Sequence, residues 1–492
     1  MTEKTKLKVL FVSAEASPFA KVGGLADVAG SLPGALRRVG VDARLVLPCY
    51  HGIADKAPSP IRDGLSGLKA SLGEETISLC VKSTMLGDTP VSLIDIPYYF
   101  DRDKIYGYPD DPHRFAAFCM AVIAWLKASD WTPDVIHCND WQTALLPALL
   151  KTVYHEDQAF RDTATVFSIH NLAYQGVVDS GMLDVFGLPW SEFTHHKLEF
   201  FGNLNIMKGG ILHADRVCTV SPTYAREILT EEYGEGLHGF LQAHAHKLSG
   251  IVNGIESAVF DPATDPHICA QFSADTINAR QENKRALLVE SGLQVRDPDM
   301  AAPLIGMVAR LTDQKGFDIL IPALDVILRR NARLVLLGDG DREIKAALTN
   351  AAKQSGGKMA VHLGFDEALA RRIYAGSDMF LMPSRFEPCG LGQMIAMRYG
   401  AAPIVRATGG LADTVKPFDP ATLLGNGFVF HEYTTPALYG AVFQAMDLFH
   451  NNRNAWHTLI GIIMKQDVSW DVSAAAYAQL YRDAAAAHLQ AD

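Results

Sequence analysis

Short, uninterrupted apolar runs recur along this chain, and each is followed by a polar or glycine turn and then by a segment with helical spacing. The first examples are residues 8–13 (KVLFVS), 134–138 (DVIHC) and 165–169 (TVFSI). A strand that lacks apolar–polar alternation is covered on both faces, as in a parallel sheet between two layers of helices. The pattern therefore predicts an α/β protein built from doubly wound parallel sheets.

A second series of such runs begins at residue 304, with residues 304–308 (LIGMV), 333–337 (RLVLL) and 379–382 (MFLM). A chain of 492 residues is long enough for two or three domains. The stretch 251–261, which precedes a segment bearing proline and aspartate, looks like the junction between them. We expect a first domain over 1–252, a second over 253–465 and a C-terminal helix within 466–492.

The net charge limits the partners of this chain. The formal charge is -11 at pH 7, with 48% apolar and 20% charged residues. Broad binding to nucleic acid or to an anionic membrane needs a basic surface, which this balance does not favour. We therefore expect no nucleic-acid or membrane partner, and a neutral partner fits better.

The cysteines and the N-terminus indicate the compartment. Seven scattered cysteines without a CxxC pair indicate neither a disulfide framework nor a zinc site. The N-terminal residues run directly into the first predicted strand, and no apolar run reaches about 18 residues. We expect a soluble, cytoplasmic protein that holds no metal.

The richest stretch of sequence is 383–415. The apolar run that precedes it ends as a buried strand does, and Glu387 follows at once. After a helix-length segment and a second short run, Thr408-Gly409-Gly410-Leu411 opens another helix. Glycine amides at a helix start suit a phosphate. Taken singly, the glycines are more often a turn and the glutamate is more often solvated.

Two cations lie at the start of the second series of strands. Arg310 ends the first strand, and Lys315 stands at the head of the next helix. The pair can reach one anionic group at the edge of a sheet. Taken alone, it could also be two surface cations without a binding role. Asp339 and Asp341 have the spacing of some metal sites, but a turn and a helix cap explain them better.

The first strand of the chain leads into a glycine turn. Glu15 lies just past the strand, and Lys21, Gly23, Gly24 and Asp27 follow at the start of a helical pattern. This is the opening unit of a doubly wound domain, where ligands bind beyond the carboxyl ends of the strands. It is not the dinucleotide fingerprint, because GxGxxG is absent. The aromatic loop 97–108 either stacks on a sugar ring or, more often for such loops, packs as core.

Several of these segments together resemble one family. SRFEPCGL (384–391) followed by TGGLADTV (408–415) resembles the signature of bacterial glycogen synthases and plant starch synthases, which are retaining glucosyltransferases. KVGGL (21–25), HNLAYQG (170–176) and RLTDQKG (310–316) resemble further motifs of that family, in its order. The resemblance extends from Glu15 to Trp470, so it covers nearly the whole chain.

The resemblance implies a fold and a reaction. The fold would be two Rossmann-like domains that face a central cleft, the GT-B type, with the C-terminal helix crossing back to the first domain and a hinge near residue 253. The reaction would be transfer of α-glucosyl units from ADP-glucose to the non-reducing end of an α-1,4-glucan (glycogen) primer, with retention and without a cofactor. UDP-glucose as donor, a catalytically silent glucan-binding homologue and a nucleotide-sugar epimerase remain as alternatives.

The resemblance also assigns roles to residues. Glu387 would position the donor sugar and stabilise charge, and Arg310 and Lys315 would clamp the departing diphosphate. His170 would donate a hydrogen bond in the transition state, and a protonated ring would also offset phosphate charge. Phe365 would stack on the nucleobase. The other expected substrate-binding residues are Glu15, Lys21, Gly23, Gly24, Asp27, Asp140, Asn253, Cys389, Gly390, Leu391, Thr408, Gly409, Gly410 and Leu411.

The chain departs from the family pattern at a few positions. Asn139 stands where the family commonly has a second histidine before Asp140, in the HxHDW motif. Gly392 replaces a common threonine, and Ile395 replaces a common tyrosine. These last two departures lie on the segment after Glu387 and bear on the nucleotide and phosphate contacts rather than on the class of reaction.

Overall fold

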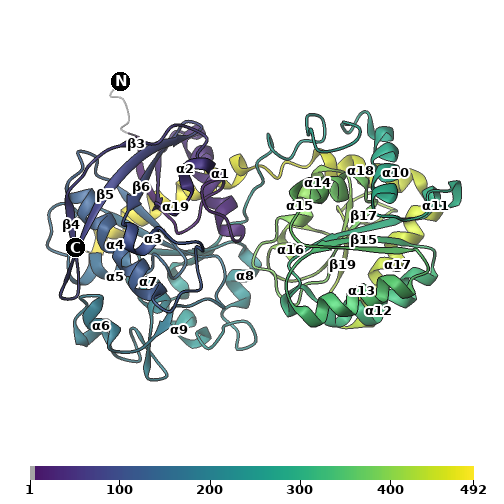
Figure 1. Ribbon diagram of the computed structural model, residues 1–492. Helices are drawn as coiled ribbons and strands as arrows, with labels where there is room; N and C mark the ends of the chain where they lie inside the picture. Colours follow the sequence, from purple (N-terminus) through teal and green to yellow (C-terminus); the bar gives the residue numbers. More distant parts are fainter. Residues whose placement is uncertain (1–5, 492) are drawn as a thin grey trace. The chain divides into compact units, whose positions relative to one another are not determined.

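The computed structural model describes residues 6–491, which form two compact units. The first unit contains the chain up to Asn253 together with the segment from Trp470 onward, and the second contains Gly254–Ser469. The expected divisions, after residues 252 and 465, lie close to these points. The last helix thus belongs to the first unit although it follows the second in sequence (Figure 1).

The first unit is built on a sheet with the strand order β13-β12-β8-β7-β1-β2-β6-β5-β3, in which β4 also pairs with β5. The strands from β13 to β6 are parallel, and the remaining pairings are antiparallel. The strands are β1 (Lys8–Val12), β2 (Asp42–Pro48), β3 (Arg62–Asp63), β4 (Leu68–Leu72), β5 (Glu75–Leu86), β6 (Thr89–Asp95), β7 (Val135–Asn139), β8 (Ala164–Ile169), β12 (Arg216–Thr219) and β13 (Leu248–Gly250).

The helices of the first unit fill the connections between these strands. They are α1 (Gly24–Arg38), α2 (Ile53–Lys56), α3 (Pro97–Phe100), α4 (Asp111–Lys127), α5 (Leu145–Thr152), α6 (Met182–Val185), α7 (Ile206–His213), α8 (Pro222–Glu227), α9 (His238–Ala243) and α19 (Trp470–Ala491), with short 3₁₀ turns at Trp190–Glu192 and Ala245–Lys247. A small antiparallel sheet joins β9 (Val177–Val178), β10 (Glu199–Phe200) and β11 (Asn203–Asn205).

The second unit has one parallel sheet in the order β16-β15-β14-β17-β18-β19. Its strands are β14 (Leu304–Val308), β15 (Arg333–Gly338), β16 (Met359–Leu363), β17 (Met379–Met382), β18 (Ala402–Arg406) and β19 (Phe428–Phe430). Its helices are α10 (Arg280–Glu290), α11 (Asp297–Ala301), α12 (Phe317–Arg329), α13 (Arg342–Gln354), α14 (Glu367–Gly376), α15 (Gly392–Arg398), α16 (Gly409–Thr414), α17 (Thr435–Asn451) and α18 (Arg453–Lys465), with 3₁₀ turns at Ile277–Ala279 and Asp313–Lys315.

These two sheets confirm the predicted doubly wound α/β class, since the uninterrupted apolar runs are buried parallel strands. The antiparallel extension through β4 and β5 was not predicted. Residues 75–86 alternate between buried and exposed positions for much of their length, which is the pattern of a strand with one solvated face. Such a segment follows a period of two rather than the continuous apolar pattern from which the parallel strands were predicted.

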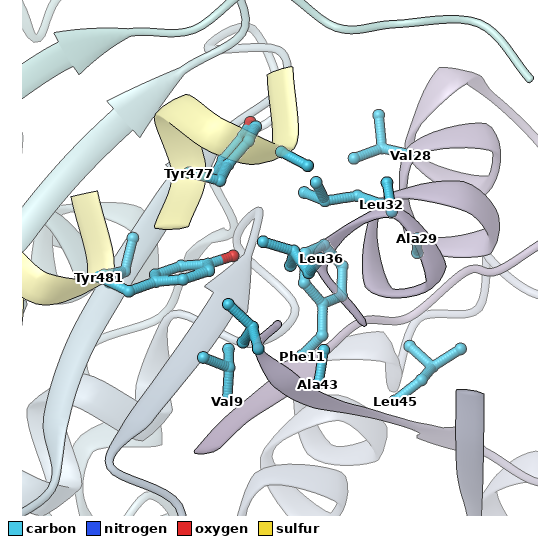
Figure 2. Close-up of a cluster of buried hydrophobic side chains, with 14 of the residues drawn as sticks. Val9, Phe11, Val28, Ala29, Leu32, Leu36, Ala43, Leu45, Tyr477 and Tyr481 are labelled. Atoms are coloured by element: carbon cyan, nitrogen blue, oxygen red, sulfur yellow. The ribbon is translucent and has the colours of Figure 1, made fainter. Parts of the chain in front are cut away.

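The C-terminal helix completes the core of the first unit. Tyr477 and Tyr481 of α19 are buried in one apolar cluster with Phe11 of β1 and Leu32 of α1. Figure 2 shows these side chains between the strands and the two helices. Because these α19 side chains bury their apolar area against the first unit, the helix stabilises that unit rather than the one that precedes it in sequence.

A buried polar chain crosses the same core. The Tyr481 hydroxyl lies 2.8 Å from Nδ1 of His137 on β7, and Nε2 of His137 lies 2.5 Å from the Ser168 hydroxyl on β8. Complete burial lowers the pKa of His137 well below its ordinary value, so the ring is neutral. Each ring nitrogen has a hydrogen-bond partner, which compensates for the burial of this polar ring.

None of the helices within residues 6–491 combines the length and the apolar character that crossing a membrane would require.

We predict that Tyr481→Phe destabilises the first unit by about 2 kcal/mol, because Nδ1 of His137 is left buried without a partner. Urea unfolding followed by hydrogen exchange of α19 and β7 peptides measures the change. Tyr98→Phe is the control, since Tyr98 is 78% exposed and its hydroxyl is free to bind water. Equal stability of the two variants would contradict the structural role of the Tyr481 hydroxyl.

Candidate active site

Three of the predicted site residues follow neighbouring parallel strands of the first unit. Glu15 comes after β1, Asp140 directly after β7, and His170 directly after β8. These strands are adjacent in the sheet, in the order β8-β7-β1. Because parallel strands end at the same edge, the three side chains belong to one edge of the sheet, which is where ligands bind in doubly wound folds.

Glu15 holds the glycine turn that leads into α1. One carboxylate oxygen accepts hydrogen bonds from the backbone N–H groups of Val22 (2.6 Å) and Gly23 (2.9 Å), and the other accepts from the Tyr106 hydroxyl (2.9 Å). Glu15 is buried, so these contacts provide the partners that a buried carboxylate needs. The amide of Gly23 is therefore occupied by the protein itself, and Glu15 acts on the shape of the turn.

The exposed side of this turn carries the other predicted residues. Lys21 forms an ion pair with Asp27, with 2.7 Å between Nζ and Oδ1, and both side chains are partly exposed. A side chain placed on Gly23 or Gly24 would meet no atom within 4 Å, so the space beside both glycines is open. A ligand can approach the backbone here, next to the ammonium group of Lys21.

The aromatic residues of 97–108 were expected either to stack on a sugar ring or to pack in the core, and the structure shows both exposed and buried rings among them. Tyr99 and Phe100 are buried core residues, whereas Tyr98 is exposed. Tyr106 binds Glu15 through its hydroxyl and so supports the glycine turn.

Asp140 fixes the backbone beside His170. Its φ is 56°, a left-handed conformation that aspartate tolerates better than most residues. Its Oδ1 accepts a hydrogen bond from the His170 N–H at 2.7 Å. Burial raises the pKa of the Asp140 carboxyl to about 7, against the lowering effect of the backbone N–H groups of His170 and Asn171.

His170 is half-buried and its ring is hydrogen-bonded to Asn139, with 2.8 Å between Nε2 and Oδ1. Burial lowers the pKa of His170 to about 4. The ring is therefore neutral at pH 7, because an imidazole is uncharged above its pKa. It does not supply the positive charge that a protonated ring would have offered to a phosphate.

In the second unit, Lys315 and Glu387 form a close ion pair. The Lys315 Nζ lies 2.5 Å from Glu387 Oε2, and the Ser384 hydroxyl donates to the same oxygen at 2.9 Å. Glu387 is buried. Arg310 follows β14, the strand beside β17, and its exposed side chain has no ion pair with any residue from 6 to 491. A carboxylate, a bound cation and an unpaired cation thus follow two adjacent strands.

Close backbone contacts hold these loops together. Gly316 has φ 77°, and a Cβ at this position would lie 2.0 Å from the Pro383 carbonyl oxygen, so only glycine fits between the two loops. The Gln314 carbonyl accepts from the Arg385 N–H at 2.8 Å, and the Gln314 amide donates to the Phe386 carbonyl at 3.2 Å. The loop that carries Lys315 is therefore fixed against the loop that carries Glu387.

The Thr408–Leu411 segment, expected to bind a phosphate, packs its backbone against the loop that carries Glu387. The Gly410 N–H donates to the Glu387 carbonyl at 3.1 Å, and the Leu411 N–H donates to the Thr408 carbonyl. A Cβ on Gly409 would lie 1.9 Å from the Glu387 carbonyl oxygen. The two glycines therefore allow close approach of backbones, and the amides of residues 410 and 411 are already engaged.

The remaining predicted residues are more dispersed. Cys389 is buried, Gly390 packs near the Glu387 side chain, and Leu391 is half-buried. Phe365 follows β16 at one edge of the second sheet and is 84% exposed, so its ring face is available for stacking. Asn253 ends the first unit, and its side-chain Oδ1 is buried without a hydrogen-bond partner.

Asp341 has the cap role that the sequence predicted. Its Oδ1 accepts from the N–H groups of Glu343 (2.7 Å) and Ile344 (3.0 Å) at the start of α13, while Asp339 pairs with Lys345. Within the described part of the chain, no group of three or more histidine, cysteine or acidic side chains is arranged to hold a metal ion.

Several residues that shape this site were not predicted from the sequence. Ser384 binds Glu387, and Gln314 holds the Lys315 loop. Both residues lie inside motifs that resemble the family, SRFEPCGL and RLTDQKG, and this position was the signal that could have identified them. Asn139 was noticed only as a departure from the family pattern, yet it contacts the His170 ring.

Comparison with known proteins matches both units to families. Residues 8–243 match the starch synthase catalytic domain, and residues 294–456 match glycosyl transferases group 1. The glycogen synthase of Desulforudis audaxviator is 47% identical over 97% of this chain and 96% of its own length. That of Thermotoga maritima is 43% identical over 98% of this chain and 99% of its own length.

Solved structures agree with these matches. The catalytic domain of starch synthase IV from Arabidopsis thaliana, bound to ADP and acarbose, has a TM-score of 0.92 and 35% identity, with 98% of this chain and 100% of that chain covered. Sucrose-phosphate synthase from Thermosynechococcus elongatus has a TM-score of 0.61 at 17% identity, over 98% of this chain and 100% of that chain, and shares the fold.

We predict that Lys315→Met destabilises the second unit by about 3 kcal/mol, because it leaves the Glu387 carboxylate buried without its cation. Adding Glu387→Gln to this variant removes the unpaired charge and is expected to restore at least half of the loss. Urea midpoints of β14 and β17 peptides, from pulsed hydrogen exchange, measure both effects.

Lys345→Met is the matched control, because its ion pair with Asp339 lies at the surface, where water and salt screen the charges and the pair contributes little to stability. A Lys315→Met protein as stable as this control would show that the pair is not structural.

Proposed function

The chain belongs to the glycogen and starch synthase family of retaining glycosyltransferases, and we propose that it transfers α-glucosyl units from ADP-glucose to the non-reducing end of an α-1,4-glucan. The observation that carries the proposal is the group of Glu387, Lys315 and exposed Arg310 after two adjacent strands of the second unit. This group offers fixed positive charge and a buried carboxylate at the edge of a parallel sheet, where such folds bind ligands.

Departure of the leaving group is the step that the cations serve. In glycosyl transfer from a nucleotide sugar, negative charge grows on the diphosphate as the bond to the sugar breaks. Preorganised positive groups stabilise that developing charge more than they stabilise the ground state. We assign this role to Arg310, which has no ion pair within the described chain, and to Lys315, which Gly316 and Gln314 hold in place.

Glu387 acts on the sugar without becoming its covalent partner. Its Oε2 already accepts hydrogen bonds from Lys315 and Ser384, so the carboxylate is fixed in place and its charge is partly compensated. Such a group suits positioning of the donor glucose and stabilisation of the positive charge that develops at the anomeric carbon. We propose that retention arises from attack on the face that the diphosphate leaves, with the departing phosphate accepting the proton of the acceptor hydroxyl.

The donor nucleotide and the residues of the first unit complete the proposal. Phe365 offers an exposed ring face for the adenine of ADP-glucose, and the related starch synthase structure contains ADP. Lys21 and the open backbone at Gly23 and Gly24 are assigned to substrate phosphate and sugar. Asp140, His170 and Asn253 are assigned to substrate contacts on the same unit.

The partners and compartment follow from the reaction. The substrates are a nucleotide sugar and a glycogen primer, and the residues that we assign need no added cofactor. We propose that the enzyme acts in the cytoplasm, and its seven free cysteines are consistent with a reducing compartment.

Incorporation of labelled glucose into glycogen from ADP-glucose, with UDP-glucose in parallel, tests the proposed function. Stronger incorporation from ADP-glucose supports both the reaction and the donor. Preference for UDP-glucose keeps the reaction and overturns the donor. No incorporation from either donor by folded protein with primer present favours a silent glucan-binding homologue or an epimerase, and release of free sugar identifies the latter.

We predict that Glu387→Gln lowers kcat for glucosyl transfer by about 10²–10³-fold, because it removes a charge that acts in the transition state. Glu387→Ala is expected to lose at least as much. Circular dichroism establishes that both variants are folded, and Glu290→Gln, at an exposed ion pair with Arg372, serves as the matched control. Near-normal turnover of Glu387→Ala with an intact fold would contradict the assignment.

A further inference from the structure

The orientation of the Asn139 side chain is determined by its surroundings. Asn139 is the last residue of β7 and is fully buried. Its Nδ2 donates to the backbone carbonyl oxygens of Val12 on β1 (3.0 Å) and His137 (3.2 Å). A carbonyl oxygen only accepts hydrogen bonds, so the amide cannot be turned around without placing its oxygen against two others. Asn139 therefore presents Oδ1, an acceptor, to the neighbouring strand end.

This acceptor fixes the tautomer of His170. Oδ1 of Asn139 lies 2.8 Å from Nε2 of the ring, so Nε2 must carry the hydrogen in this contact. A neutral imidazole has only one N–H, which leaves Nδ1 as a lone pair. No hydrogen bond joins this Nδ1 to another residue in the described part of the chain, and His170 is only half-buried.

We propose that Asn139 is a positioning residue for glucosyl transfer, which holds His170 as the neutral Nε2–H tautomer so that Nδ1 accepts a hydrogen bond from a hydroxyl group of the bound sugar. The inference rests on the proposed function and changes one part of the expectation drawn from the sequence. A ring whose only N–H already donates to Asn139 is a hydrogen-bond acceptor toward substrate, not a donor.

The backbone of His170 is held by the same strand end. Asp140, the next residue after Asn139, accepts from the His170 N–H at 2.7 Å. Two consecutive residues thus fix the two halves of His170: Asp140 holds its main chain, and Asn139 holds its ring. This pairing leaves the ring little freedom to rotate Nδ1 away from the direction set by the fold.

The side chain at position 139 also decides which tautomers of His170 can find a partner. Asparagine is uncharged at every pH, so it does not attract the charged form of the ring. Unlike a histidine, it also has no second tautomer that could exchange its donor and acceptor. The histidine that the family commonly has at this position would be able to donate as well as accept, and either neutral tautomer of His170 would then find a partner. Asparagine removes that ambiguity.

The titratable groups around the His170 ring are few. His137 of β7 is buried and neutral, and its pKa is lowered mainly by burial and further by His170. Asp140 contacts the His170 backbone, and burial raises its pKa to about 7. Glu15, after β1, and Tyr224, on α8, interact electrostatically with Asp140. Burial alone accounts for the lowered pKa of His170, which is about 4.

Nitrogen-15 NMR of histidine-labelled protein tests the inference directly. The His170 signals are identified by their loss in His170→Gln. We expect a protonated Nε2 and an unprotonated Nδ1 in the wild type at pH 7. A protonated Nδ1, or a mixture of both neutral tautomers, would overturn the inference. This result depends on no other variant, so it decides the matter even if substitutions at residue 139 do not fold.

Asn139→Asp supplies the functional readout. Its second carboxylate oxygen would face the carbonyl oxygens of Val12 and His137, so circular dichroism first establishes that the variant is folded. The carboxylate stabilises the charged ring, and an opposite charge in contact raises a histidine pKa by about one to three units. A rise of about two units from 4 would leave roughly one tenth of the ring neutral at pH 5. We expect kcat of Asn139→Asp, relative to wild type, to fall about tenfold between pH 8 and pH 5, with the His170 pKa measured by NMR rising in parallel.

Asn283→Asp is the matched control, because Asn283 is also buried and its side chain binds only the backbone of Ala270, in the other unit. It is expected to leave the pH profile of kcat and the His170 pKa unchanged. An Asn139→Asp protein whose relative pH profile and His170 pKa both match wild type would overturn the positioning role. Absence of transfer by the wild type would instead overturn the proposed function, while the NMR result would still decide the tautomer.

Discussion

Parallel pairing of strands is the constraint on which the rest of this structure depends. Because β8, β7 and β1 run in the same direction, the chain leaves all three at one edge and places Glu15, Asp140 and His170 there. The second sheet does the same for Arg310, after β14, and Glu387, after β17. Residues that are far apart in sequence are thus assembled by sheet topology, and the buried apolar strands supply the rigidity that such a site needs.

At each edge, several of the polar groups bind other groups of the protein itself. Glu15 occupies the Gly23 amide, Glu387 is bound by Lys315 and Ser384, and Asn139 binds the His170 ring. Burial then sets the protonation of the groups that remain, with a His170 pKa of about 4 and an Asp140 pKa of about 7. We therefore propose different tasks for the neutral ring and the two cations: hydrogen bonding to sugar for His170, and charge stabilisation at the diphosphate for Arg310 and Lys315.

The sequence predicted the strand ends well, because continuous apolar runs are a direct consequence of burial on both faces. It predicted neither the use of the glycine amides nor the orientation of side chains. Gly410 donates to the carbonyl of Glu387, a contact between two loops that no local pattern announces. The Asn139 amide is oriented by Val12, which lies 127 residues earlier in sequence, and His137 meets Tyr481 across 344 residues. Such partners are determined by tertiary packing, so they cannot be predicted from the local sequence.

The central claim is that the cations after β14 act on the diphosphate of the donor. Calorimetric binding of ADP and AMP to Arg310→Met tests it most directly, because Arg310 is exposed and has no ion pair within residues 6–491, so we expect the variant to fold. A charge-assisted hydrogen bond contributes about 1.5–3 kcal/mol, so ADP affinity is expected to fall about 10- to 100-fold, with a much smaller loss for AMP. Equal loss for the two nucleotides, or unchanged ADP affinity, would contradict the account.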